Sequence, residues 1–370
     1  MLKPASGACN LRCGYCFYAD VAASRQVSSY GLMSQSTLDK IVRRAFAYAE
    51  GQLSFIFQGG EPLLAGKAFF RHFNQEVRAY AHKPVRVSCA VQTNATLIDE
   101  EWCQIFREGG YLVGVSLDGE EQTHDLYRRD ASGAPTCARV KRAIGLLKAS
   151  GVECNVLCVV TRQISLRPEA SFEALRQYGY LQFIPCLDPF DGGRAEYSLD
   201  AGEYGDFLIK TWDLYERALF SPHPVSVRVF DNWLNMLLGR PPENCAMSGR
   251  CGQYYLIEAD GGVYPCDFYV LDKWRLGNIN ETGFRAFAES GIGQAFREES
   301  HPVHEKCRAC PWLFLCRGGC KREREPILNG APSLNRLCEG HRRFFEARYE
   351  NMKRTAQRLN KGMLAGASKG

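Results

Sequence analysis

Cysteines are the residues most able to do chemistry in this chain, which has 17 of them among 370 residues. Three of these, Cys9, Cys13 and Cys16, form a C-x3-C-x2-C loop near the chain start. Three thiolates can bind three irons of a [4Fe–4S] cluster and leave the fourth iron open to another ligand. A zinc loop is the alternative, but structural zinc prefers four protein ligands and no fourth Cys or His lies nearby in the sequence. The spacing therefore favours an iron–sulfur cluster with one open iron.

A second group of cysteines fills the last third of the chain. The group comprises Cys245, Cys251, Cys266, Cys307, Cys310, Cys316, Cys320 and Cys338. Eight thiolates complete two four-thiolate sites, which is enough for two closed clusters, although the C-x2-C spacing also permits a pair of zinc ribbons. The other six cysteines lack ligand spacing, and we expect them to be small buried hydrophobes: Cys89, Cys103, Cys137, Cys154, Cys158 and Cys186.

Composition excludes several other roles. The chain start has no apolar signal-peptide region, and no stretch approaches the ~18 apolar residues of a membrane span. An odd number of cysteines also fits poorly with a fully paired disulfide framework. We therefore expect a cytoplasmic protein with reduced thiols and no membrane contact. The net charge of +5 is too small to indicate a nucleic-acid partner.

Short apolar runs alternate with helical patterns through the first half of the chain. The runs cover residues 53–57, 85–91, 112–115, 154–160 and 181–184. Between them lie amphipathic stripes such as the one from Leu38 to Phe46, with Ser34 as its N-cap. Strands that alternate with helices predict parallel βαβ units, and polar residues at the strand ends predict the position of the chemistry.

The alternation stops near Pro222–Pro224, where the composition shifts. We expect a barrel domain over residues 1–225, a cysteine-rich domain over 226–340, and a basic helix with a tail over 341–370. The last segment has eight Lys or Arg residues and two Glu residues. A solvated basic helix is the simpler interpretation, and nucleic-acid or membrane contact is the alternative.

The first cysteine loop resembles the motif of the radical S-adenosylmethionine superfamily. In that superfamily the open iron binds the amino and carboxylate groups of S-adenosylmethionine. Gly59-Gly60-Glu61, after the run at 53–57, resembles the GGE motif that holds the methionine amino group, and glycine permits close backbone approach there. The resemblance implies cofactor contacts also from Tyr15, Ser116, Arg128 and Leu187. It implies an α/β fold with a partial (β/α)6 TIM-type barrel.

The second group of cysteines looks like the SPASM extension of these enzymes. The pattern is C-x9-G-x4-C, then C-x2-C-x5-C-x3-C, then a last Cys. In the family the ligands of two auxiliary [4Fe–4S] clusters interleave, making three clusters in all. The resemblance assigns Cys245, Cys251, Cys266 and Cys320 to one auxiliary cluster. It assigns Cys307, Cys310, Cys316 and Cys338 to the other.

Three blocks resemble the anaerobic sulfatase-maturating enzymes: residues 9–18, 57–62 and 263–278. That family oxidises a Cys or Ser in a sulfatase C/S-x-P-x-R segment to Cα-formylglycine. The resemblance implies that Asp267 is the base, and more weakly that Tyr18 and Gln58 contact the peptide. It implies a nascent or unfolded sulfatase and a flavodoxin- or ferredoxin-type electron donor as partners. A structural carboxylate that caps a turn is the alternative for Asp267.

One departure from the family concerns the first barrel strand. Only Met1-Leu2 precede Lys3-Pro4, so this strand is a stub or the start lies upstream. Two other functions remain open at this point. One is a SPASM enzyme that crosslinks or epimerises a ribosomal peptide, and the other is a non-catalytic zinc-binding interaction module.

Overall fold

A curved, all-parallel sheet of six strands forms the first part of the molecule. The computed structural model describes residues 1–328 and 330–367, and the side chains up to residue 361. The strands run in the order β1 (Gln52–Phe57), β2 (Arg86–Thr93), β3 (Tyr111–Ser116), β4 (Cys154–Val160), β5 (Tyr180–Pro185) and β6 (Ser226–Val227). The sheet stays open, as a partial barrel.

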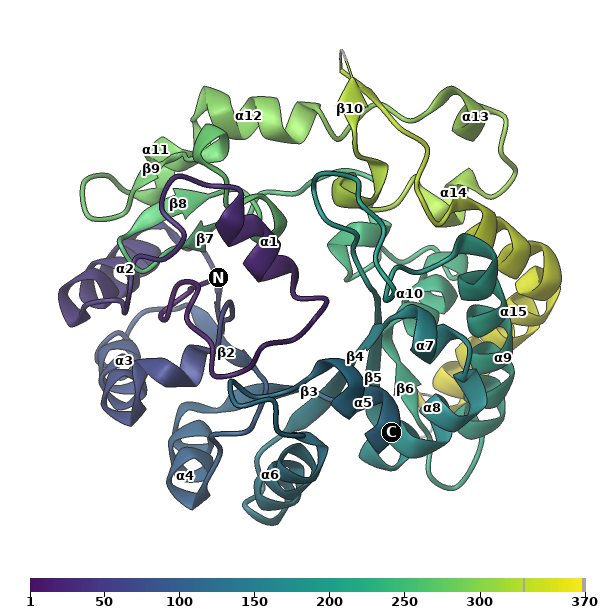
Figure 1. Ribbon diagram of the computed structural model, residues 1–370, viewed down its shortest axis with the longest axis horizontal. Helices are drawn as coiled ribbons and strands as arrows, with labels where there is room; N and C mark the ends of the chain where they lie inside the picture. Colours follow the sequence, from purple (N-terminus) through teal and green to yellow (C-terminus); the bar gives the residue numbers. More distant parts are fainter. Residues whose placement is uncertain (329, 368–370) are drawn as a thin grey trace.

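Helices between the strands cover the outside of this sheet (Figure 1). The longer ones are α2 (Gln35–Tyr48), α3 (Lys67–Ala79), α4 (Glu100–Gly109), α6 (Cys137–Ala149), α8 (Pro168–Leu175) and α9 (Ala201–Leu219). The shorter helices of this part of the chain do not all lie on the outside, since α1 (Phe17–Ala23) precedes the first strand and lies near the centre of Figure 1. The others are η1 (Pro62–Ala65), α5 (Glu121–Tyr127), α7 (Arg162–Ser165), η2 (Arg176–Tyr178) and α10 (Arg228–Leu237). In α2 the predicted cap is confirmed, because the Ser34 side chain accepts a hydrogen bond from the Thr37 N–H.

The predicted β/α alternation is confirmed for the five apolar runs, which become β1 to β5 within two residues at each end. The sixth strand differs from the prediction. It is the two-residue β6, just beyond the expected domain boundary at 225, and only Val227 of its two residues is β-branched. At the predicted first strand, Leu2 forms only isolated parallel bridges, one to Phe57 and one to Ile257, among the described residues.

An aromatic cluster packs β1 against its covering helix. The ring of Phe57 lies 4.8 Å from the rings of both Phe70 and Phe73, measured between centroids, and all three are fully buried. Aromatic rings of this size contribute strongly to a core through the area that they bury. The cluster fixes the end of β1, where the Gly-Gly-Glu segment begins.

Residues 245–337 lie across the upper part of Figure 1. It contains an antiparallel sheet of β7 (Leu256–Ile257), β8 (Gly262–Tyr264) and β9 (Gly277–Asn278), and a hairpin of β10 (Ile327–Leu328) and β11 (Ala331–Pro332). Its short helices are η3 (Cys245–Met247), η4 (Asp267–Tyr269), η5 (Asp272–Trp274), α11 (Phe284–Ala288), α12 (Gly291–Glu298), α13 (Glu305–Arg308), α14 (Leu313–Cys316) and η6 (Lys321–Arg324).

The last helix, α15 (Cys338–Ala367), returns to the barrel and packs against α9. The sequence predicted a solvated basic helix here. Instead one face is buried, with Phe344, Phe345 and Met352 at 0% exposure, while Arg342 on another face is exposed. The predicted tail at 368–370 lies outside the described residues. Among the helices that the structure describes, none is long and apolar enough to cross a membrane.

A buried ion group joins the two parts of the chain. Glu258, directly after β7, lies 2.7 Å from the Lys3 ammonium and 2.9 Å from the Arg25 guanidinium, and all three side chains are at most 1% exposed. Buried charges are tolerated only when they are paired in this way. The segment before the first cysteine loop is therefore tied directly to the C-terminal sheet.

Candidate functional site

The loop of the first cysteine set lies between Lys3 and α1, at the carboxyl edge of the sheet. Its backbone is fixed to the segment after α5, since the Arg12 N–H donates to the Arg129 carbonyl at 2.7 Å. Burial raises the pKa of Cys13 to about 12, and the thiols of Cys16 and Cys9 act in the same direction. The structure thus brings these three thiols together.

The Gly-Gly segment packs against this loop so closely that no side chain would fit. A Cβ on Gly60 would lie 2.2 Å from the Ala8 carbonyl oxygen, and a Cβ on Gly59 would collide with the Lys3 side chain. Both glycines also have positive φ, which other L-residues rarely adopt. The Glu61 N–H donates to Ala8 at 2.8 Å. The first cysteine loop and the Gly-Gly-Glu segment therefore pack directly against each other through their backbones.

The Glu61 side chain turns inward and is 1% exposed. Its carboxylate accepts hydrogen bonds from the N–H groups of Leu63 and Asn94 and from the Thr93 hydroxyl. Burial raises the pKa of Glu61 to about 7, and these donors offset only part of the effect of burial. The Glu61 side chain therefore ties the Gly-Gly-Glu segment to the end of β2.

The four other predicted cofactor contacts lie along the same edge of the sheet. Ser116 ends β3 and accepts a hydrogen bond from Gln92 at 3.4 Å, and Leu187 follows β5. Tyr15 and Arg128 contact each other, with the guanidinium 5.4 Å from the ring centroid. Both also bond to Asp118, a residue that the sequence analysis missed.

The eight C-terminal cysteines fall into two neighbouring groups. Burial raises the pKa of Cys320, and the thiols of Cys245 and Cys251 raise it further, while Cys320 does the same to Cys266. Burial likewise raises the pKa of Cys316 to about 12, with Cys338 and Cys307 acting in the same direction, and Cys310 acts on Cys338. We name these the second cysteine set (Cys245, Cys251, Cys266 and Cys320) and the third cysteine set (Cys307, Cys310, Cys316 and Cys338).

The spacing of the thiols distinguishes between a cluster and a single ion. Four thiolates on one tetrahedral zinc lie about 3.8 Å apart, since each Zn–S bond is ~2.3 Å long. Within residues 1–328 and 330–367, no three cysteine sulfurs lie within 4.8 Å of one another. Thiolates that each bind a different iron stand further apart, so the three sets fit multi-iron clusters better than zinc.

The six remaining cysteines match their predicted role, since five are buried and Cys154 is partly buried.

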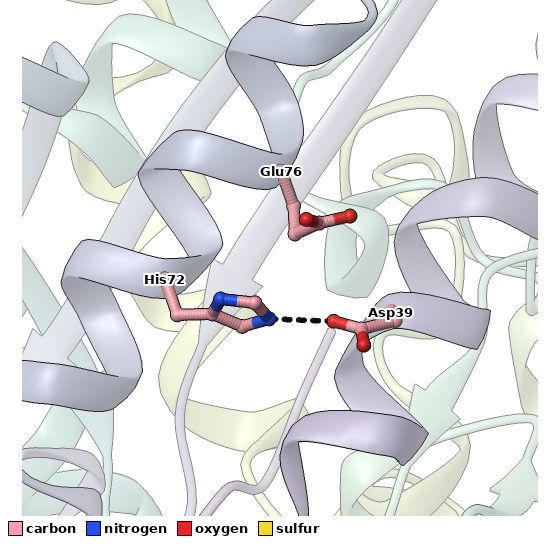
Figure 2. Close-up of side chains that lie close together, drawn as sticks. All are labelled: Asp39, His72 and Glu76. Atoms are coloured by element: carbon pink, nitrogen blue, oxygen red, sulfur yellow. Dashed lines mark hydrogen bonds and ion pairs between the residues drawn. The ribbon is translucent and has the colours of Figure 1, made fainter.

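Figure 2 shows a different group of side chains of the kinds that bind metals. It lies on the outer helices, where Asp39 of α2 faces His72 and Glu76 of α3. The His72 Nε2 atom lies 2.6 Å from the Asp39 carboxylate. This direct bond between two helices accounts for the arrangement, and we assign no metal to it.

The predicted base lies where the barrel meets the C-terminal sheet. Asp267 is 7% exposed, and the Gln58 amide lies 3.4 Å from its Oδ2 and 2.7 Å from the Tyr18 hydroxyl. The three predicted reaction-side residues thus form one hydrogen-bonded chain. Tyr254, which no sequence pattern indicated, donates to Asp267 Oδ1 at 2.7 Å and lies 3.3 Å from the Cys266 sulfur.

Comparison with known proteins agrees with this geometry. The Radical SAM superfamily profile matches residues 4–175, and the SPASM iron–sulfur cluster-binding domain matches 245–311. The chain is 40% identical to the cysteine-type anaerobic sulfatase-maturating enzyme of Clostridium perfringens, over 97% of this chain and 98% of that one. The serine-type enzyme of Klebsiella aerogenes is 31% identical, over 93% of this chain and 84% of the other.

The chain belongs to the anaerobic sulfatase-maturating enzymes. It is therefore a radical S-adenosylmethionine enzyme with a SPASM iron–sulfur domain, which excludes the non-catalytic zinc module. A solved structure of native anSMEcpe with bound AdoMet and Cp18Cys peptide superposes on it with a TM-score of 0.92 at 39% identity. That superposition covers 97% of this chain and 98% of the other, and it confirms the predicted barrel and cysteine-rich domain.

The raised pKa of Glu61 predicts that the stability of this maturating enzyme depends on pH. Its pKa rises from 4.5 in the unfolded chain to about 7 in the folded protein, so the folded state binds the extra proton between these values. The free energy of unfolding should therefore fall as pH rises from 4.5 to 7, by up to about 3 kcal/mol from this residue. The Glu61→Gln variant should lose this slope. Urea denaturation across that pH range, compared between the two proteins, checks it; parallel curves would contradict the assignment.

Proposed function

We propose that this chain oxidises a cysteine, or a serine, in a sulfatase C/S-x-P-x-R segment to Cα-formylglycine. The observation that carries the proposal is the hydrogen-bonded chain of Tyr18, Gln58 and Asp267 beside Cys266. It brings a carboxylate from the SPASM domain to the strand ends of the barrel, next to the first cysteine loop. Similarity to cysteine-type enzymes over nearly the whole chain supports cysteine as the preferred substrate residue.

The proposed cofactor sites follow the residue groups described above. The first cysteine set would hold a [4Fe–4S] cluster with an open iron, and the second and third sets would each hold a closed auxiliary cluster. S-adenosylmethionine would contact Tyr15, Gly59, Gly60, Glu61, Ser116, Arg128 and Leu187. When bound, these groups supply a 5′-deoxyadenosyl radical that removes a Cβ hydrogen atom, and an acceptor for one further electron.

The chain's own residues would then accept the proton of the substrate thiol. Loss of the Cβ hydrogen atom, one electron and the thiol proton converts –CH2–SH into a thioaldehyde. Water hydrolyses the thioaldehyde to the aldehyde and releases sulfide. Asp267 would accept the thiol proton on Oδ2, the oxygen that faces Gln58, because Oδ1 is already bonded to Tyr254. Gln58 and Tyr18 would orient the substrate side chain toward this oxygen.

The proposed partners are a sulfatase polypeptide in unfolded or nascent form and a flavodoxin- or ferredoxin-type electron donor. A peptide that carries the modified residue must reach the buried Asp267, which a folded globular substrate cannot do. The similar structure with a bound Cp18Cys peptide supports a peptide as the ligand.

Anaerobic incubation of the reconstituted enzyme with S-adenosylmethionine, a reductant and a C-x-P-x-R peptide tests the function. Mass spectrometry should show replacement of the thiol by an aldehyde and release of sulfide. A crosslinked or epimerised peptide would instead support the alternative of another SPASM peptide-modifying enzyme and would exclude maturation.

Replacing the base should separate radical formation from oxidation. In Asp267→Asn, formylglycine formation should fall by ~100-fold or more, because no group accepts the thiol proton. Formation of 5′-deoxyadenosine should continue. Asp272→Asn is the control and should retain full activity, because among the described residues the Asp272 carboxylate accepts a hydrogen bond from the Gln26 backbone N–H alone. Chromatography of both products from one reaction measures the ratio, and equal losses of both would rule out Asp267 as the base.

Iron analysis should distinguish the three proposed clusters. The reconstituted chain should contain about twelve irons, and the Cys9→Ala/Cys13→Ala/Cys16→Ala variant about eight, since only one cluster is lost. Cys103→Ala removes a buried thiol of α4 and should leave the value at about twelve. An unchanged iron content in the triple variant would show that the first set holds no cluster.

A further inference from the structure

Two predicted cofactor contacts, Tyr15 and Arg128, converge on one buried carboxylate. Asp118 follows β3 and is 2% exposed. Its Oδ2 accepts the Arg128 Nε–H at 2.7 Å and a short hydrogen bond from the Tyr15 hydroxyl. Its Oδ1 accepts the Val159 N–H of β4 at 2.8 Å and a longer bond from Arg128 Nη2 at 3.4 Å. All four groups around the carboxylate are donors.

A second chain of hydrogen bonds connects the backbones of Asp118 and Arg128. The Asp118 N–H donates to His124 Nδ1 at 3.2 Å, and His124 Nε2 lies 3.0 Å from the Thr136 hydroxyl. That hydroxyl donates to the Arg128 carbonyl at 2.6 Å. Burial lowers the pKa of His124 to about 4, so the imidazole is neutral and its proton sits on Nε2. Hydrogen bonds therefore hold the backbone at both ends of the segment from Asp118 to Arg128.

This arrangement fixes the direction in which Arg128 can act. Asp118 occupies the Nε and Nη2 edge of the guanidinium, and within the described residues Nη1 donates no hydrogen bond to protein. Arginine has five N–H donors in a rigid plane, so a carboxylate on one edge leaves the other edge for a second anion. The Tyr15 ring is held in the same way through its hydroxyl.

We propose that Asp118 is a positioning residue that aligns Tyr15 and Arg128 for S-adenosylmethionine, the ring toward the adenine and the guanidinium toward the carboxylate. The proposal rests on the cofactor contacts proposed above and adds the group that sets their geometry. Asparagine cannot replace this carboxylate. Whichever way its amide is turned, the NH2 group faces two donors, so Val159 or the pair of Tyr15 and Arg128 must move.

The test measures cofactor binding rather than formylglycine formation. Calorimetric titration of S-adenosylmethionine into the anaerobically reconstituted holoenzyme should give a dissociation constant about 10- to 100-fold higher for Asp118→Asn than for wild type. The change in the electron paramagnetic resonance spectrum on addition of S-adenosylmethionine should weaken in parallel, while the iron content stays unchanged. If wild type itself fails to bind, the proposed cofactor site is wrong; if wild type and Asp118→Asn bind equally, Asp118 has no positioning role.

Asp231→Asn is the matched control. Asp231 is also a largely buried carboxylate that accepts from a tyrosine, Tyr215 at 2.6 Å, but it lies on α10 and bonds to none of the predicted cofactor contacts. Its variant should bind S-adenosylmethionine like wild type, and an equal loss of affinity there would assign the effect to general destabilisation. Adding Asp118→Asn to an Arg128→Gln background should cost much less than in wild type, because the two residues act as a unit. Fully additive losses would overturn the proposal.

Discussion

The buried carboxylate of Glu258 is the constraint on which the alignment of the two domains depends. Burial alone would raise the pKa of this carboxyl, but Lys3 and Arg25 hold it below its ordinary value, so the group stays charged. Two cations from the barrel side therefore share one anion from the C-terminal sheet. A packing of the domains that buried Lys3 and Arg25 without Glu258 would leave two uncompensated charges, which is strongly unfavourable. The ion group therefore favours this one alignment of the two domains.

The position of the reaction-side residues follows from this junction. Lys3 contacts Gly59 through its stem and lies 5.1 Å from the centre of the Tyr18 ring, so the residue that pairs with Glu258 also packs beneath the active residues. The Phe17 and Phe268 rings, 4.9 Å apart, extend the same contact from α1 to η4. Asp267 and Gln58 belong to different domains. Their contact therefore depends on this packing between the domains.

Local spacing explains how much of this could be predicted from the sequence. Two kinds of local pattern were predicted. One is a set of metal ligands in a short loop, such as Cys9 to Cys16, and the other is the apolar stripe of a helix, such as that of α2. Partners that meet only through the fold leave no such pattern. Asp118 and Tyr254 were missed because their partners lie 10 to 103 residues away for Asp118 and 12 or 13 residues away for Tyr254. The strand β6 was missed because two residues are too few to show a period.

The two halves of the proposed chemistry have different structural origins. Tyr15, Asp118 and Arg128 all belong to the barrel, so the proposed cofactor site can remain unchanged when the C-terminal domain changes. The proposed base, Asp267, comes in contrast from the SPASM domain and is hydrogen-bonded through Gln58 to Tyr18 of the barrel. Changes in the segment around Cys266 would therefore alter what happens to the substrate radical without altering how it is made. This separation gives a physical reason why enzymes with the same barrel can carry out different peptide oxidations.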